Sequence, residues 1–453
     1  MVTTLQRPAL VEGLQQRRQH LARLFSQPVV IWSGQAPSRN FPANTYPFRA
    51  NSHFLYFAGR PLAHAAVHLH QGTMTLFWDE PTADDALWHG PQPSRADLAT
   101  TMGADAAYPM ADLPQYLQQA VCLPAQQPIW QSFSDSSMQP HEASQALAAA
   151  IVQLRLNHDA FGLAQIQAAA KVSVAAHKTG MAATLAASTE AEVRAAMEQV
   201  IMAHQMTCAY NSIVTVHGEV LHNEQYHHPL EPQDLLLADV GAEAASGWAS
   251  DITRTWPVSG RFTSPQRDIY DVVLAAHDAA IAEARPGAEY IDLHLLASTV
   301  LATGLVDLGI LRGDPETLVE RDAHALFFPH GVGHLLGLDV HDMEDLGDLA
   351  GYAPGRTRSN RFGLAFLRLD RPLQAGMVVT IEPGFYQVPG ILAPARASGE
   401  YDDAVNWDQL DQFSAVRGIR IEDDVHITES GCQVLTQELP STPDAVEQLV
   451  LQG

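Results

Sequence analysis

Residues 328–342 read FPHGVGHLLGLDVHD and hold three histidines, His330, His334 and His341, among glycines and apolar residues. Glycines this dense argue against a helix, because each costs about 1 kcal/mol relative to alanine in a helix interior. The stretch also lacks the HExxH pattern, which places two zinc ligands one turn apart on a helix. Any metal ligand here must therefore act from a loop or a strand. A lone histidine is usually a hydrogen-bonded core residue, but this density favours a functional site.

Two aspartates frame a predicted β-hairpin upstream of this stretch. Residues 235–238 (LLLA) form a buried-strand pattern that ends at Asp239, and the chain returns through residues 247–250 to Asp251 and a second strand. Paired strands can point both carboxylates at one place, where they repel each other unless a cation or a shared proton lies between them. Either aspartate alone would be interpreted as a turn cap or a solvated side chain.

Two glutamates end further apolar strand patterns: Glu382 lies in TIEPG and Glu422 in GIRIEDD. Buried carboxylates need partners. Two aspartates, two glutamates and one histidine form a mostly oxygen ligand set, which suits manganese, cobalt or iron(II) and also accommodates zinc. Pairs of such ions, about 3.5–4 Å apart, activate a water and polarise a carbonyl, which is the chemistry of metallo-aminopeptidases.

The blocks DVG with SDITRT, HGVGHLLGLDVHD, TIEPG and GIRIEDD, in this order, resemble the metal-site blocks of the pita-bread metallopeptidases. The resemblance covers residues 160–440, and residues 46–59 (YPFRANSHFLYFAG) are similar to the N-terminal domain of aminopeptidases P. It implies an α+β pita-bread catalytic domain over residues 156–453 and an α/β N-terminal domain over residues 1–155. It also implies two divalent metal ions per chain, manganese above all, with cobalt, zinc or iron as alternatives.

The resemblance also implies roles for individual residues. Five of them match the metal ligands of the family: Asp239, Asp251, His334, Glu382 and Glu422. The resemblance implies that Glu382 also moves the proton of the attacking water. His341 and His222 match substrate-side histidines, His330 lies beside them, and Arg420 matches a substrate-side arginine.

Two departures from the family pattern concern the ligand hairpin and a neighbouring loop. Asp251 and Glu422 match bridging ligands, but Asp239 and Asp251 are twelve positions apart where the family more often shows eleven. We therefore expect an extra residue in the hairpin loop. Residues 215–218 (TVHG) differ from the usual glycine-rich loop of the family at the mouth of the site.

Residues 391–396 (ILAPAR), followed by residues 405–407 (VNW), resemble the insertion of prolidases. In prolidases the arginine that matches Arg396 binds the free carboxylate of a dipeptide, and a guanidinium fork has the right shape for that. The resemblance therefore implies an Xaa-Pro dipeptidase, whose substrate is a small peptide with proline at the second position. The alternative is an Xaa-Pro aminopeptidase that acts on longer peptides. Without the flanking match, Arg396 would be interpreted as an exposed loop arginine.

Two other functions are compatible with the fold that the resemblance implies. Creatinase-type enzymes use this fold without a metal, and some pita-bread domains are non-catalytic binding modules with eroded ligands. All five matching ligands are present in this chain, which favours a metal-dependent enzyme over both.

Composition narrows the range of partners and locations. The chain has 453 residues with 26 Lys and Arg against 51 Asp and Glu, a formal net charge of -25. This charge disfavours nucleic acid and anionic membranes as partners, although its main effect is to keep the protein soluble. The three widely spaced cysteines form neither a disulfide framework nor a CxxC zinc site, and together with the lack of a signal-peptide pattern they predict a cytoplasmic protein. The resemblance implies a homodimer or a larger homo-oligomer.

Hydrophobic periodicity predicts the main elements. In the first third of the chain we expect one helix at 8–25 and strands at 29–32, 53–57, 65–69 and 73–77. Further on we expect long helices at 163–187, 190–206 and 264–285. Thr189 and Glu192 have the spacing of a capping box for the second of these.

Overall fold

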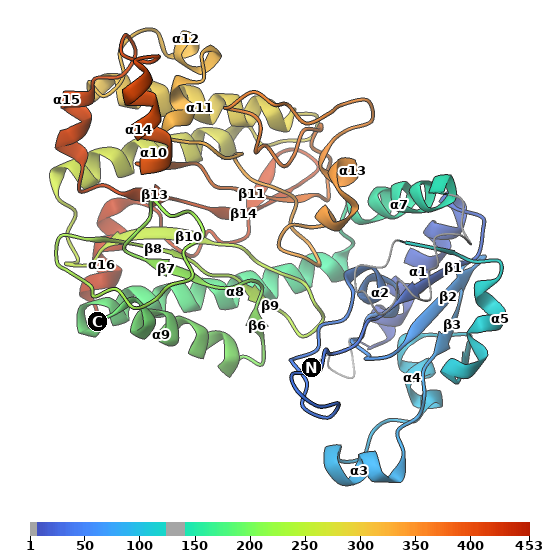
Figure 1. The fold of residues 1–453 in the computed structure, drawn as a ribbon. Helices are drawn as coiled ribbons and strands as arrows, with labels where there is room; N and C mark the ends of the chain where they lie inside the picture. The colour runs from blue at the N-terminus through green and yellow to red at the C-terminus, as the bar shows by residue number, and fades with distance from the viewer. Residues whose placement is uncertain (1–6, 124–140) are drawn as a thin grey trace. The chain divides into compact units, whose positions relative to one another are not determined.

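The computed structural model describes residues 7–123 and 141–453 (Figure 1). The chain divides into two compact units. Unit 1 comprises Met1–Phe161 together with Ala245–Gly247, and unit 2 comprises Gly162–Ala244 together with Trp248–Gly453. Among the described residues, no helix is both long enough and apolar enough to cross a membrane.

Unit 1 is built on a five-stranded mixed sheet with the strand order β4-β3-β2-β1-β5. Strand β1 pairs antiparallel with β2 and parallel with β5, and all four residues of its VVIW run are buried. A continuous apolar run is typical of a strand covered on both faces. The strands are β1 Val29–Trp32, β2 Ala66–His70, β3 Thr73–Phe77, β4 Ala106–Tyr108 and β5 Val121–Cys122. The helices are α1 Arg7–Leu24, α2 Ser52–Ala58, α3 Ala83–His89, α4 Arg95–Met102, α5 Pro114–Leu117 and α7 His141–Arg155.

The strand predicted at 53–57 is wrong, because these residues belong to helix α2. The side chain of Asn51 caps the helix by accepting hydrogen bonds from the backbone N–H groups of His53 (2.9 Å) and Phe54 (3.2 Å). Gly59, at φ +67°, ends it in the left-handed conformation. All seven residues of α2 are buried, so the short apolar run that suggested a strand is a helix covered on every side.

Unit 2 holds four small antiparallel sheets and most of the long helices. The sheets have the orders β10-β8-β7, β11-β14-β15, β12-β13 and β6-β9. The strands are β6 Thr207–Cys208, β7 Ile213–Thr215, β8 Leu235–Asp239, β9 Ala242–Glu243, β10 Thr253–Pro257, β11 Val378–Ile381, β12 Gly384–Tyr386, β13 Gly418–Arg420, β14 Asp423–Ile427 and β15 Cys432–Val434. The helices include α8 Ala160–Ala183, α9 Glu190–Ala203, α10 Ser264–Glu283, α11 Tyr290–Asp307, α12 Pro315–Glu320, α13 Asp348–Gly351, α14 Pro389–Ser398, α15 Trp407–Leu410 and α16 Pro443–Leu451.

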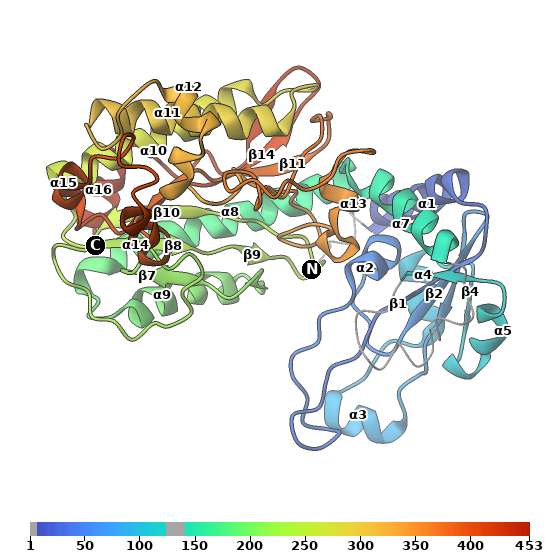
Figure 2. The same ribbon diagram turned by 45° about the horizontal axis from the view of Figure 1, so that its top comes forward.

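The strands of unit 2 lie between two pairs of helices, with α8 and α9 on one side and α10 and α11 on the other (Figures 1 and 2). Apolar side chains of α9, β7, β8 and β10 share one core, which contains Met197, Val214, Leu236 and Trp256. The three predicted long helices are present within a few residues of their expected bounds. The capping box at the start of α9 is absent: Thr189 makes no side-chain cap, and Glu192 accepts instead from the backbone N–H of Ser188 at 2.8 Å.

Two histidines are buried in unit 2 next to the 328–342 segment. His294 is completely buried, its Nε2 bonds to the carbonyl of Gly363 at 2.9 Å, and its ring lies 5.5 Å from that of Phe328. His324 is 2% exposed. Burial is the main reason why the pKa of His294 falls to about 4 and that of His324 to about 3. Both imidazoles are therefore neutral in the folded protein at pH 5.

We predict that His324 makes the protein less stable in acid. Because its pKa is depressed in the folded state, the unfolded chain binds a proton below pH 6.5 that the folded chain rejects, so the free energy of unfolding falls as the pH falls from 6.5 towards 3. For one histidine the loss between pH 7 and pH 5 is about 2 kcal/mol. Urea unfolding of His324→Leu at both pH values should show a loss smaller by that amount, whereas His20→Leu, at an exposed position of α1, should behave like the parent protein. An equal loss in all three proteins contradicts the prediction.

Candidate metal and active site

The predicted hairpin is present and places the two aspartates. Strand β8 pairs antiparallel with β10, and Asp239, the last residue of β8, lies opposite Thr253. Asp251 comes just before β10, and its backbone N–H donates to the carboxylate of Asp424 at 3.0 Å. Both aspartates are buried, at 9% and 5% exposure.

The glycine-rich segment that carries His334 runs beside β11. The backbone N–H of Thr380 donates to the carbonyl of His334 (3.0 Å), and that of Glu382 donates to the carbonyl of Val332 (2.7 Å). Gly333, at φ +154°, has no room for a side chain, because a Cβ atom would come within 2.3 Å of the Tyr290 hydroxyl. The glycines therefore allow the segment to pack closely against β11, which brings His334 near Glu382 without a helix.

Glu422 lies between β13 and β14, and the hairpin strand β10 fixes it. Its backbone N–H donates to the carbonyl of Thr253 (3.0 Å), and its Oε2 accepts from the hydroxyl of the same threonine (2.7 Å). The side chain is 2% exposed. An isolated antiparallel bridge between Glu422 and Thr253, the first residue of β10, thus brings this glutamate to the two aspartates of the hairpin.

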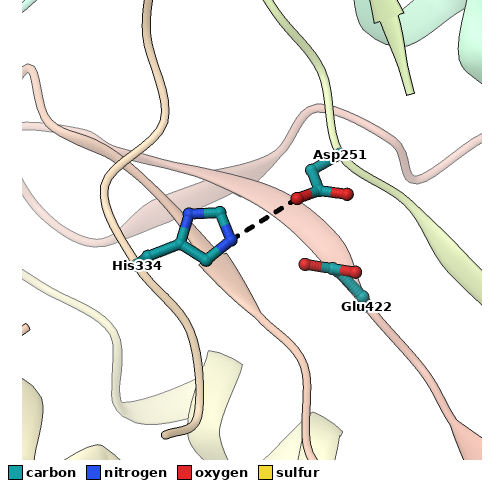
Figure 3. A group of neighbouring side chains, drawn as sticks. All are labelled: Asp251, His334 and Glu422. Atoms are coloured by element: carbon teal, nitrogen blue, oxygen red, sulfur yellow. Dashed lines mark ion pairs between the residues drawn. The ribbon is translucent and has the colours of Figure 1, made fainter. Parts of the chain in front are cut away.

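Asp251, His334 and Glu422 form a compact buried group (Figure 3). One ligand atom from each lies within 4.8 Å of the others, and Nε2 of His334 is 3.4 Å from Oδ2 of Asp251. Glu382 lies next to them, with its Oε1 3.9 Å from the same Nε2. Nδ1 of His334 bonds to the carbonyl of Leu335 at 3.0 Å, which assigns the proton to Nδ1 and leaves the Nε2 lone pair facing the carboxylates.

Asp239, like Glu382, lies outside the compact group of Asp251, His334 and Glu422. Its Oδ1 accepts from the hydroxyl of Tyr210 at 2.5 Å, and its Oδ2 accepts from Arg420 at 2.5 Å. The Tyr210 hydroxyl also bonds to Asp251, so one phenol connects the two aspartates. Sequence reasoning missed Tyr210, since a tyrosine 29 positions before Asp239 follows no motif or period that could reveal it.

The carboxylates repel one another in a buried setting. Burial raises the pKa of Asp251 well above its usual range, and the charge of Asp239 raises it further. Burial also raises the pKa of Glu422, with Asp251 as the next cause, and that of Glu382, with Glu422 as the next cause. Divalent cations relieve such repulsion, and the donor set of carboxylate oxygens with one imidazole nitrogen suits them. The residues present therefore fit metal ions.

The three predicted substrate-side histidines surround this group. His330 bonds through Nε2 to the Tyr386 hydroxyl (2.9 Å), and burial lowers its pKa to about 3. The ring of His341 lies near that of His334, with the centroids 4.0 Å apart and the planes tilted by 37°, and burial lowers the pKa of His341 to about 4. Burial also lowers the pKa of His222, with Arg420 as the next cause. All three rings are therefore neutral at pH 7.

Arg420, for which the resemblance implies a substrate-side role, is 3% exposed and lies beside Asp239. Its guanidinium donates to Asp239, to the hydroxyl of Tyr386 (3.1 Å) and to that of Thr253 (3.0 Å). These three hydrogen bonds fix the positively charged guanidinium of Arg420 beside the acidic side chains. A guanidinium is suited to this position because it stays charged when buried.

Arg396 is placed differently from the expectation. Half of its side chain is exposed, it pairs with Asp411 at 3.3 Å, and it lies over the ring of Trp407. None of these contacts is with a predicted site residue. Besides Arg420, a second arginine acts on the site through its charge: Arg368, which sequence reasoning missed.

Arg368 donates to Glu344 at 2.7 Å, and the same carboxylate lies 3.2 Å from Nδ1 of His341. After burial, the positive charge of Arg368 is among the causes that lower the pKa values of His222, His334 and His341. Its side chain is 38% exposed. Arg368 lies in the 367–371 stretch LRLDR, where arginine and aspartate together suggest only a solvated loop, so the sequence offered no signal for it.

Comparisons with known proteins agree with this geometry. Residues 164–429 match the model of metallopeptidase family M24, and residues 14–130 match the aminopeptidase P N-terminal domain. A probable Xaa-Pro aminopeptidase of Talaromyces marneffei is 33% identical over 89% of this chain and 88% of its own length. A probable Xaa-Pro aminopeptidase of Podospora anserina is 32% identical over the same shares.

Solved structures show the same relationship. Proline aminopeptidase P II from Yersinia pestis has a TM-score of 0.80 at 29% identity and covers 98% of this chain and 100% of its own. Aminopeptidase P from Escherichia coli with the inhibitor Pro-Leu has a TM-score of 0.81 at 27% identity, covering 97% and 98%. The expected architecture, a pita-bread catalytic domain preceded by an α/β N-terminal domain, is confirmed. The chain therefore belongs to metallopeptidase family M24.

Proposed function

We propose that this protein is a metal-dependent Xaa-Pro aminopeptidase, which removes the first residue of a peptide when proline is the second. The observation that carries the proposal is the buried group of Asp251, His334 and Glu422, with Glu382 beside it, in a chain of family M24. The names of the relatives support the aminopeptidase over the dipeptidase that the sequence suggested.

The residues that would hold two divalent ions are those of the predicted set: Asp239, Asp251, His334, Glu382 and Glu422. When bound, the ions supply Lewis acidity, which lowers the pKa of the attacking water and polarises the scissile carbonyl. We propose manganese as the metal, because oxygen ligands predominate. Asp251 and Glu422 are the two carboxylates of the compact group, and the resemblance implies that they would serve both ions.

The protein residues perform the proton transfers and hold the substrate. The backbone N–H of Glu382 donates to the carbonyl of Val332, which holds this residue close to the group. Its carboxylate takes the proton of the attacking water and delivers it to the proline nitrogen, which must gain a proton to leave. His341 and His222, both neutral, can donate hydrogen bonds to the carbonyl oxygen as negative charge develops on it. His330 and Arg420 both form hydrogen bonds with the hydroxyl of Tyr386, and we propose that they line the site beside these histidines.

A dipeptidase is the second candidate, and one observation favours it. The positive charge of Arg368 reaches His222 and His341, so the C-terminal carboxylate of a bound Xaa-Pro dipeptide could pair with it. Arg396, for which this role was predicted, is tied to Asp411 on the surface. If peptide length is sensed by an arginine, the structure favours Arg368 over Arg396.

Peptide length separates the two candidates. For an aminopeptidase, we predict that kcat/KM for Ala-Pro-Ala equals or exceeds that for Ala-Pro, because the site needs no terminal carboxylate after proline. For a dipeptidase, Ala-Pro would be preferred by about tenfold to a hundredfold, the effect of one charge-assisted pair. The measurement is steady-state hydrolysis of both peptides by manganese-loaded protein.

Two arginine variants sharpen this comparison. In the dipeptidase case Arg368→Ala should remove the preference for the dipeptide, and Arg396→Ala serves as the matched control that leaves it intact. In the aminopeptidase case neither variant changes the ratio of the two kcat/KM values. Failure to cleave either peptide with metal bound would overturn the proposed function.

Three further properties stay proposals. We propose a cytoplasmic location, since no disulfide joins any of the three cysteines. We propose a homodimer or larger homo-oligomer, as the resemblance implies. We also propose that residues 1–155 form the aminopeptidase P-like domain and residues 156–453 the catalytic domain. The match at residues 164–429 and the compact unit that begins at Gly162 support this division.

A further inference from the structure

The loop that carries His222 has no regular secondary structure, yet it is closed at both ends by one side chain. We define this loop as residues 216–228, between the end of β7 and the segment that leads to β8. Helix α9 lies beside β7 (Figure 1), and its first residue, Glu190, points inward and is completely buried. A buried carboxylate at this place requires hydrogen-bond donors.

The two oxygens of Glu190 bind the two ends of the loop. Oε1 accepts from the backbone N–H of Val216 (2.8 Å) and from the hydroxyl of Thr215 (3.0 Å). Oε2 accepts from the backbone N–H of His228 (3.3 Å) and bonds to Nδ1 of its ring (2.8 Å). The start and the end of the loop are thus joined through a single carboxylate.

A second set of contacts continues from Glu190 to the residue next to His222. Because the hydroxyl of Thr215 donates to Glu190, both of its lone pairs are left to accept, and they bind the backbone N–H of His217 (2.9 Å) and Nδ2 of Asn223 (2.9 Å). Asn223 is 7% exposed and directly follows His222. The hydroxyl of Thr215 thus donates one hydrogen bond and accepts two, which is the most that a hydroxyl can form, so the direction of each bond is determined.

The opposite side of the loop is packed against the strand that carries Arg420. A Cβ atom on Gly218 would come within 2.8 Å of the carbonyl oxygen of Gly418, and one on Gly418 would come within 2.3 Å of Gly218. The loop therefore cannot move toward β13. Glu190 prevents it from moving the other way, so the position of His222 depends on this carboxylate.

We propose that Glu190 is a positioning residue for His222: by binding both ends of the 216–228 loop and, through Thr215, Asn223, it holds that imidazole at the substrate side of the site. Glu190 touches neither substrate nor metal ligand. This inference rests on the proposed role of His222 in Xaa-Pro hydrolysis.

The first test is Glu190→Gln, which keeps the size of the side chain. A carboxamide can accept at one end of the loop, but its NH2 group then faces the donor N–H of His228 at the other end. We expect kcat/KM for Ala-Pro-Ala to fall about tenfold to a hundredfold, since small displacements of a positioned group have effects of this size. Metal content should stay unchanged. Glu192→Gln, which alters an exposed glutamate in the first turn of α9, is the matched control and should keep parental activity.

A double-mutant comparison distinguishes positioning from general damage to the fold. In a His222→Ala background, Glu190→Gln should change kcat/KM by no more than about twofold, because the group that it positions is gone. A full additional loss in that background overturns the proposal, and so does a Glu190→Gln protein of parental activity. Hydrolysis by the unaltered protein is measured first: absence of cleavage counts against the proposed function, whereas cleavage insensitive to Glu190 counts only against the positioning role.

A pair of Thr215 variants keeps the inference testable if Glu190→Gln does not fold. Thr215→Val is close in shape but loses the hydroxyl that connects Glu190 to Asn223, and we expect a smaller loss of kcat/KM in the same direction. Thr215→Ser restores the hydroxyl and should recover most of that loss. Equal activity of the two variants contradicts the proposal.

Discussion

The Glu422→Ala protein is expected to lose kcat/KM for Xaa-Pro peptides by a factor on the order of a thousand or more, because several kcal/mol of transition-state stabilisation depend on the metals. Glu422 belongs to the compact buried group with Asp251 and His334, and it accepts a hydrogen bond from the hydroxyl of Thr253 in β10. Without its carboxylate, we expect fewer than two equivalents of manganese to remain after reconstitution. Steady-state kinetics and elemental analysis on the same preparation measure both effects.

The control for this variant is Glu429→Ala, an exposed glutamate in the turn that follows β14. It should keep the metal content and the activity of the parent. A second readout concerns stability: manganese should raise the melting temperature of the parent protein by mass action, and it should do so much less in Glu422→Ala. Two tightly bound ions and parental turnover in Glu422→Ala would exclude the residue from the ligand set.

The Glu382→Gln protein is expected to show a kcat lower by about a hundredfold to ten-thousandfold, the range of general acid–base catalysis. Glutamine keeps an oxygen that can face the metals but cannot take a proton, so KM should change much less than kcat. The backbone bond from Glu382 to Val332 is unaffected, and the fold should persist. His341→Ala should lower kcat in the same way by a smaller factor, since it removes one hydrogen-bond donor.

Glu400→Gln, at an exposed position after α14, is the control for the loss of one carboxylate. If Glu382→Gln keeps near-parental turnover with metal bound, the proton is moved by another group. If instead it loses its metal, the residue acts mainly as a ligand. Elemental analysis of the purified variant separates these two results from the expected one.

Sequence reasoning succeeded where a local pattern has a single structural solution. The alternating and continuous apolar runs around residues 29–32, 65–69, 73–77 and 235–239 are strands, and the long Ala-rich segments are helices. The hairpin was predictable because two apolar runs with polar ends can pair in only a few registers. The prediction for residues 53–57 was wrong because a short apolar run fits a buried helix as well as a strand. The helix cap formed by Asn51 is the local signal that could have decided between them.

The order of four motifs along the chain was enough to indicate the family, because the chemistry of a family demands particular residues at particular points of the fold. The chain by itself could not show which charges lie near one another. Arg368 reaches the site while Arg396 does not, Tyr210 connects two aspartates, and Glu190 holds a loop that begins 26 positions later. Each of these depends on side chains brought together from distant segments by packing. A residue's type determines what chemistry it can do, but only the tertiary structure decides which partners lie within the few ångströms over which hydrogen bonds act.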